Sequence, residues 1–139
     1  MDTINGLLET AWKIDDDSEL DNAFTKSFKF IDCSLKIETR GTFYRKFIKY
    51  ANKKPTPTYG FEDRMIVKPL NSDKFTPLRV WFIFFDVELE NGLRIGFKAE
   101  YYGGFDNRYF LEEAIVHNCN PDKPALERFV NYKQCSKVY

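Results

Sequence analysis

The side chains that most often carry out catalysis or bind metals are few in this sequence. The single histidine, His117, is followed by Cys119 two positions later and by Cys135 near the end of the chain. A thiol beside an imidazole can form a nucleophilic pair, and the three groups together offer ligands for zinc. The spacing nevertheless lacks the close Cys-x-x-Cys pair of zinc sites, and no flanking sequence is typical of a cysteine protease. We therefore predict no catalytic residue, no metal site and no cofactor.

Carboxylates are the other groups with possible chemistry. Five charged side chains share one face of a predicted hairpin: Asp86, Glu88, Arg94, Lys98 and Glu100. A carboxylate buried among aromatic rings can have a raised pKa and act as a general acid or base. Here a basic side chain lies near each carboxylate, which is typical of an ion-paired face in solvent. Glu112 and Glu113 have no patterned partner.

The hairpin that positions these carboxylates is predicted to span residues 79–101. Apolar residues occupy the odd positions of both strands: Trp81, Ile83, Phe85, Val87, Leu89, Leu93, Ile95, Phe97, Ala99 and Tyr101. This alternation indicates strands with one buried face. A three-residue loop, 90–92, keeps the two apolar sets together, and Gly92 supplies its left-handed residue. The same register sets two pairs of residues opposite each other: Glu88 with Arg94, and Phe84 with Lys98.

The second face of the first strand changes from apolar to acidic along its length. It carries Val80, Phe82 and Phe84, and then Asp86, Glu88 and Glu90. The apolar part needs a cover, which can be a helix of this chain, a second copy of it, or another protein. Aromatic side chains dominate the binding energy of many protein interfaces. We therefore predict a partner-binding surface at five residues: Phe82, Phe84, Asp86, Glu88 and Glu90.

Residues 43–54 combine aromatic and basic side chains in a second pattern of interest. Five basic residues alternate with Phe and Tyr there, as in surfaces that stack bases and contact phosphates. However, the 21 basic and 21 acidic residues of the chain cancel, and no phosphate-binding glycine loop is present. These features argue against nucleic acid as the partner.

Length and composition predict one domain over residues 1–139, with an unusually aromatic core (17% Phe, Trp and Tyr). No apolar stretch is long enough to span a bilayer, so no membrane partner is expected. The amino terminus lacks the features of a signal peptide. The odd number of cysteines, without a close pair, favours reduced thiols and a cytoplasmic location.

The remaining segments are predicted from periodicity. Residues 3–14 fit an amphipathic helix, and Ser18 begins a second short helical piece. Residues 28–39 alternate as a strand with Ile31, Cys33, Leu35 and Ile37 inward. Proline-rich residues 55–60 are predicted to be a loop, and 65–67 a short strand.

Two segments fit both a helix and a strand: 43–53 and 108–117. We favour a strand for each, because the first is rich in aromatics and the second follows the Gly103-Gly104 turn. After Asn120-Pro121-Asp122 a C-terminal helix is predicted.

Together these elements predict an α+β fold. It consists of a twisted antiparallel sheet of five to six strands, in a meander or roll-like arrangement, with N- and C-terminal helices packed on one face. Roll-like folds leave room for a pocket between the sheet and the helices.

Three functions from different classes are compatible with the sequence. The preferred one is a small cytosolic protein-binding module of the immunity type, which neutralises a toxin, nuclease or other enzyme. The alternative is a small-ligand pocket protein or enzyme that uses a carboxylate such as Asp86 or Glu100. The third is single-stranded nucleic-acid binding through residues 43–54. The absence of a catalytic motif favours a non-enzymatic role, and a homodimer is also compatible, because a second copy can cover Phe82 and Phe84.

Overall fold

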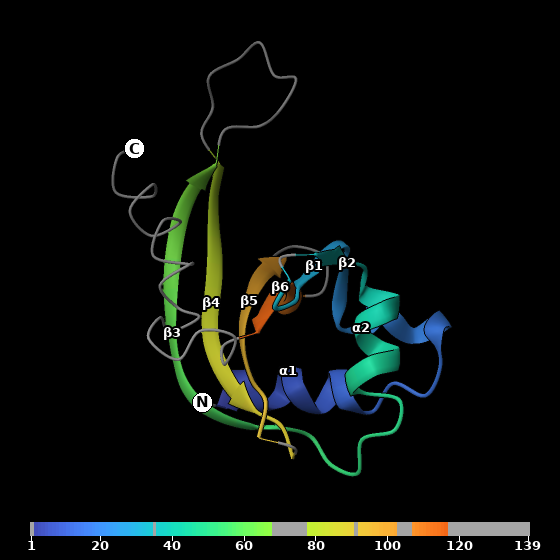
Figure 1. The fold of residues 1–139 in the computed structure, drawn as a ribbon. Coiled ribbons are helices and arrows are strands. Elements are labelled where there is room, and N and C mark those ends of the chain that lie inside the picture. The colour runs from blue at the N-terminus through green and yellow to red at the C-terminus, as the bar shows by residue number, and fades with distance from the viewer. Residues whose placement is uncertain (1, 35, 68–77, 91, 103–106, 117–139) are drawn as a thin grey trace.

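The computed structural model describes residues 2–34, 36–67, 78–90, 92–102 and 107–116 (Figure 1). In chain order the elements are α1 (Asp2–Trp12), the 3₁₀ helix η1 (Asp17–Asn22), β1 (Phe24–Ile31), β2 (Ile37–Glu38), α2 (Arg40–Phe47), β3 (Thr56–Val67), β4 (Leu78–Glu88), β5 (Arg94–Tyr102) and β6 (Arg108–Val116). This is the α+β fold that the sequence predicts. The predicted C-terminal helix lies outside the described residues.

A six-stranded sheet with the order β2-β1-β6-β5-β4-β3 forms the body of the molecule. Strands β3 to β6 form the predicted antiparallel meander, and residues 108–116 of the ambiguous segment 108–117 form a strand, as predicted. The sheet is mixed, because β1 joins β6 in parallel. Strands β3 and β4 form a long curved pair that extends past the other strands (Figure 1).

The register of the central hairpin is confirmed. Glu88 pairs with Arg94, and Phe84 pairs with Lys98. At the turn, the Leu89 amide donates to the Leu93 carbonyl at 2.8 Å, and Gly92 has a φ of +83°. Only a glycine adopts such a positive φ without a steric penalty.

Both α-helices among the described residues pack on the same face of the sheet. Helix α1 contacts β3 and β6, and α2 contacts β1. The core between them contains the odd positions of the hairpin, including Ile83, Phe85 and Phe97. Helix α1 crosses β3 closely at Gly60, where an added Cβ would lie 2.5 Å from Ile4 Cδ1. The predicted helix at 3–14 and the inward face of the hairpin are thus confirmed.

The prediction for residues 28–39 is wrong in both its limits and its face. The strand β1 begins earlier, and Phe24, Phe28 and Phe30 are its buried aromatic residues. Ile37 is 63% exposed. The even positions are buried because three phenylalanines bury more apolar area than the aliphatic residues at the odd positions.

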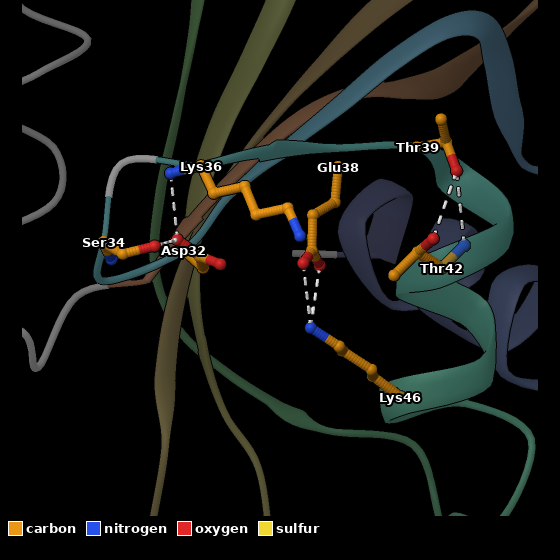
Figure 2. A network of polar contacts seen from close by, with 7 residues as sticks. All are labelled: Asp32, Ser34, Lys36, Glu38, Thr39, Thr42 and Lys46. Carbon is orange, nitrogen blue, oxygen red and sulfur yellow. Dashed lines mark hydrogen bonds and ion pairs between the residues drawn. The ribbon is translucent and has the colours of Figure 1, made fainter.

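Residues 40–47 form a helix, so the strand prediction for segment 43–53 is wrong. Thr39 caps it, because its hydroxyl accepts from the Thr42 amide at 3.4 Å. Phe43 and Phe47, one turn apart, then face the core. Lys46, in the last turn of α2, donates to the Glu38 carboxylate at 2.9 and 3.0 Å (Figure 2).

A turn anchored by Asp32 leads from β1 into β2. Its carboxylate accepts from the amides of Ser34 and Lys36, each at 3.0 Å, and from the Ser34 hydroxyl at 2.7 Å (Figure 2). The strand that follows this turn carries Glu38 beside α2, where its carboxylate holds the Lys46 ammonium (Figure 2).

Residues 56–67 form the long strand β3, which corrects the prediction of a loop at 55–60. A strand is compatible with Pro57 here because β3 lies at the edge of the sheet, where proline removes fewer ladder hydrogen bonds. The pairing of β3 with β4 shifts register between Pro57 and Tyr59, which accommodates the local irregularity.

Cys33, in the turn after β1, is disulfide-bonded. The prediction of reduced thiols is therefore wrong for this residue, while Cys119 and Cys135 lie outside the described residues. Disulfides persist mainly in oxidising compartments, so the predicted cytoplasmic location loses one of its supports. No helix in the described part of the chain is long and apolar enough to cross a membrane.

Candidate functional site

The predicted partner-binding residues divide into a buried group and an exposed group. Phe82, Phe84 and Asp86 are 4%, 0% and 9% exposed, whereas Glu88 and Glu90 are exposed. Helices α1 and α2 lie on the opposite face, so they do not cover the phenylalanines. Of the five predicted residues, Glu88 and Glu90 are therefore accessible from outside, whereas Phe82 and Phe84 are accessible only if the chain uncovers them. A protein partner at this surface stays a prediction.

The second face of the sheet is only partly the solvent face that the sequence suggests, because Glu88 and Arg94 are exposed but Asp86 and Lys98 are buried. Asp86 is 9% exposed, Lys98 is 5% exposed, and Glu113, which pairs with Lys98 across the β5–β6 ladder, is 6% exposed. The Lys98 ammonium lies 4.4 Å from the centroid of the Phe82 ring. Burial of a charged group is costly unless partners compensate it. Asp86, Lys98 and Glu113 thus form a buried charged cluster on this face of the sheet.

Glu112 belongs to the same cluster, although the sequence gives it no patterned partner. Its carboxylate lies 3.7 Å from the Lys98 ammonium. Burial raises its pKa, the Glu100 and Glu113 carboxylates raise it further, and Lys98 and Lys29 act in the opposite direction. A bulge brings it there, because Lys98 pairs with Glu113 while Ala99 pairs with Leu111. Periodicity alone does not reveal such a bulge.

Tyr102 and Glu100 form a hydrogen-bonded pair beside this cluster. The Tyr102 hydroxyl donates to Glu100 Oε2 at 2.9 Å. Burial, the bond to Glu100 and the charge of Glu112 raise the pKa of Tyr102 to about 12. The phenol therefore stays protonated at physiological pH and remains a hydrogen-bond donor.

An apolar cleft of about 460 Å³ opens beside Tyr102. Seven residues line this β1–β6 cleft: Asp21, Phe24, Thr25, Lys26, Ser27, Tyr102 and Phe110. Tyr102 and Phe110 form one wall with rings 5.4 Å apart. On the other wall the Thr25 and Ser27 hydroxyls lie 3.5 Å from each other. The cleft therefore has aromatic and hydroxyl-bearing walls, and its volume falls in the range of small-molecule sites.

By contrast, aromatic side chains fill the core between the helices and the sheet. Phe43 is fully buried and contacts the rings of six aromatic residues: Trp12, Phe24, Phe28, Phe30, Phe47 and Phe97. Two further clefts lie at the margins of this core. One of about 320 Å³ lies between α1 and the β5–β6 strands, and one of about 190 Å³ lies beside Trp12.

The aromatic and basic segment at 43–54 does not form a base-stacking platform. Phe43 and Tyr44 are buried, and Tyr50, at 80% exposure, is the exposed aromatic residue of this segment. Arg45 pairs with Asp17 at 3.2 Å. The basic groups that would contact phosphates are thus partly engaged with neighbours of the same chain. Groups of side chains that could hold a metal ion are absent from the described residues, and His117 lies outside them.

Comparisons with known proteins give limited information. No protein-family model and no curated protein match this sequence. A crystal structure from Parabacteroides distasonis, of a protein provisionally described as a ketosteroid isomerase, is similar in structure. The two chains are 14% identical, the match covers 81% of this chain and 83% of the other, and the TM-score is 0.40. We assign neither a family nor a function from a similarity at this level.

Proposed function

We propose that this chain is a small-ligand-binding protein, and that the β1–β6 cleft is its site. The observation that carries the proposal is an apolar cleft of about 460 Å³ whose lining includes the Thr25 and Ser27 hydroxyls. Ligand sites of this kind bury an apolar body and use a few polar groups to fix its orientation. The aromatic core between the helices and the sheet is filled, and the cleft of about 320 Å³ between α1 and the β5–β6 strands is smaller.

The lining residues define the class of ligand. The rings of Phe110 and Tyr102, together with Phe24, favour a flat apolar body. Hydroxyls of Thr25 and Ser27 can donate and accept hydrogen bonds, so a neutral hydroxyl or carbonyl group on the ligand finds partners. We therefore expect a neutral ring compound with one such polar group.

Glu112 adds the possibility of proton exchange beside the cleft. Its raised pKa follows from burial, and its charge acts on Tyr102, which lines the cleft. Carboxylates with raised pKa values are the usual general acids and bases of enzymes that work near neutral pH. The proposal itself requires only binding. Turnover would be an additional property of the same site.

The experiment compares 2-naphthol with naphthalene by chemical-shift mapping of the labelled protein. We expect 2-naphthol to bind more tightly, and its shifts to centre on Thr25, Ser27 and Phe110. The Tyr102 hydroxyl donates to Glu100 but can still accept from the hydroxyl of 2-naphthol, so Tyr102→Phe should reduce the preference for 2-naphthol about 3–10-fold, the usual net value of one hydrogen bond.

Tyr50→Phe is the matched control, because it also removes a phenolic hydroxyl but lies outside the β1–β6 cleft. It should leave the affinity for 2-naphthol unchanged. Equal binding of both compounds, or shifts that centre on another part of the protein, would contradict the proposal.

A further inference from the structure

The indole of Trp12, the last residue of α1, presents a buried donor that the fold does not use. The ring packs edge-to-face on Phe43 at 6.4 Å and on Phe97 at 6.5 Å. Its Nε1 exposes less than 1 Å² and has no hydrogen-bond partner among the described residues. Buried donors are nearly always paired in native proteins, since an unmade bond costs the desolvation of the group. The position therefore needs an explanation.

A cleft of about 190 Å³ lies directly beside this indole. Besides Trp12, its lining includes Phe47, Tyr50, Lys53, Leu89 and Glu90, and we call it the Trp12 cleft. Typical sites for drug-sized molecules measure roughly 300–1,000 Å³. A single ring with one substituent therefore approaches the limit of what the Trp12 cleft can hold.

The two lysines that line the Trp12 cleft, Lys46 and Lys53, differ in their ion pairs. Lys46 also lines it, but Glu38, with a side chain only 8% exposed, holds its ammonium at 2.9 Å (Figure 2). Lys53 has no ion pair within the part of the chain that the structure describes. The neighbouring Lys54 faces elsewhere and donates to Asn5 Oδ1 at 3.2 Å. Lys53 is thus the cation that this cleft offers to a ligand, whereas the Glu90 carboxylate in the same lining disfavours an anion.

We propose that the Trp12 cleft is a second binding site, separate from the β1–β6 cleft, for a small aromatic carboxylate. The ring of the ligand packs against Phe47 and Leu89, and its carboxylate accepts from the Lys53 ammonium and from Trp12 Nε1–H. An ionised acceptor forms shorter and stronger bonds than a neutral one, so both donors favour an anion. Because Nε1 is covered, a neighbouring side chain has to shift as the ligand enters, and Leu89 and Phe47 line the cleft and are only partly buried.

Benzoate is the probe, and the test uses the intrinsic fluorescence of Trp12. The chain has two tryptophans, so Trp81→Phe, at a position that is 44% exposed, leaves Trp12 as the reporter. Benzoate should change the Trp12 emission in a saturable way at low salt. Benzamide, a neutral molecule of similar shape, should bind at least about fivefold more weakly, because its acceptor carries no charge.

Lys53→Ala and Lys54→Ala, each made in the Trp81→Phe background, form a matched pair. Lys53→Ala should weaken benzoate binding about fivefold or more, and Lys54→Ala should change it less than about twofold. Tyr102→Phe should leave it unchanged, which separates this site from the β1–β6 cleft. The proposal is overturned if the emission does not saturate, if benzamide matches benzoate, or if the two lysine variants behave alike.

Discussion

Replacement of Phe43 by alanine tests whether the space between the helices and the sheet is packed or hollow. Phe43 is 0% exposed, and its centroid lies 5.0–6.4 Å from those of its six aromatic neighbours. Those neighbours belong to α1, β1, α2 and β5, so they cannot all move into the space that the ring leaves. A cavity that cannot collapse adds its own cost to the lost transfer free energy.

The expected cost of Phe43→Ala is therefore in the upper part of the range for buried phenylalanines, about 4–5 kcal/mol. Phe43→Leu keeps most of the apolar volume and should cost about 1–2 kcal/mol. Tyr50→Ala removes an aromatic residue that is 80% exposed, only seven positions away, and should change the free energy of unfolding by less than about 0.5 kcal/mol. Because a domain of this kind has roughly 5–15 kcal/mol in total, Phe43→Ala is close to the limit of folding.

Urea denaturation followed by circular dichroism measures all three changes. If Phe43→Ala costs less than about 1.5 kcal/mol, or no more than Tyr50→Ala, the ring is not enclosed as described. A ligand-sized space between the helices and the sheet would then be open, and the site would have to be sought there instead of in the β1–β6 cleft.

Three further predictions concern pH, backbone space and the disulfide. Because burial raises the pKa of Glu112 above its ordinary value of 4.5, the folded state binds this proton more tightly than the unfolded state, and stability is lost as pH rises through that raised pKa. Glu112→Gln should therefore raise the melting temperature at pH 7–8 but much less at pH 4, and an equal shift at both would contradict this assignment. Gly6→Ala has nothing within 4 Å of its new Cβ, so it should raise the free energy of unfolding by about 0.5–1 kcal/mol in the same urea assay. Gly60→Ala would place its Cβ 3.1 Å from Phe85 Cβ, so it should lower the free energy of unfolding by about 1–3 kcal/mol. Dithiothreitol should lower the melting temperature of the native protein and leave that of Cys33→Ser unchanged, and a native protein insensitive to the reductant would show that Cys33 contributes no cross-link in solution.

The sequence predicts the local features of this fold well, because their signals lie within a few residues. In the central hairpin, period-two alternation and Gly92 both require the same register, which the structure has. Segment 43–53 was ambiguous because Phe43, Phe47 and Tyr50 fit a helix face while alternate residues fit a strand. The Thr39 cap, three residues before Thr42, was the available signal that a helix begins there.

The candidate site was harder to predict, since it depends on contacts between distant segments. The burial of Asp86 and Lys98 depends on what covers the second face, which no local pattern contains. Glu112 reaches Lys98 through a bulge, and the β1–β6 cleft joins residues near position 25 to Tyr102 and Phe110. A single sequence gives no signal for the parallel pairing that brings them together.

That parallel pairing of β1 with β6 also affects how the chain folds during synthesis. Phe24 pairs with Leu111, so an early strand waits for one of the last described segments before it has a neighbour on that side. At about 5–20 residues per second, the interval is on the order of 4–17 s. During that time Phe24, Phe28 and Phe30 have only β2 and α2 beside them, and the rest of the sheet is missing. Fragments that stop before β6 should therefore aggregate instead of forming a smaller domain.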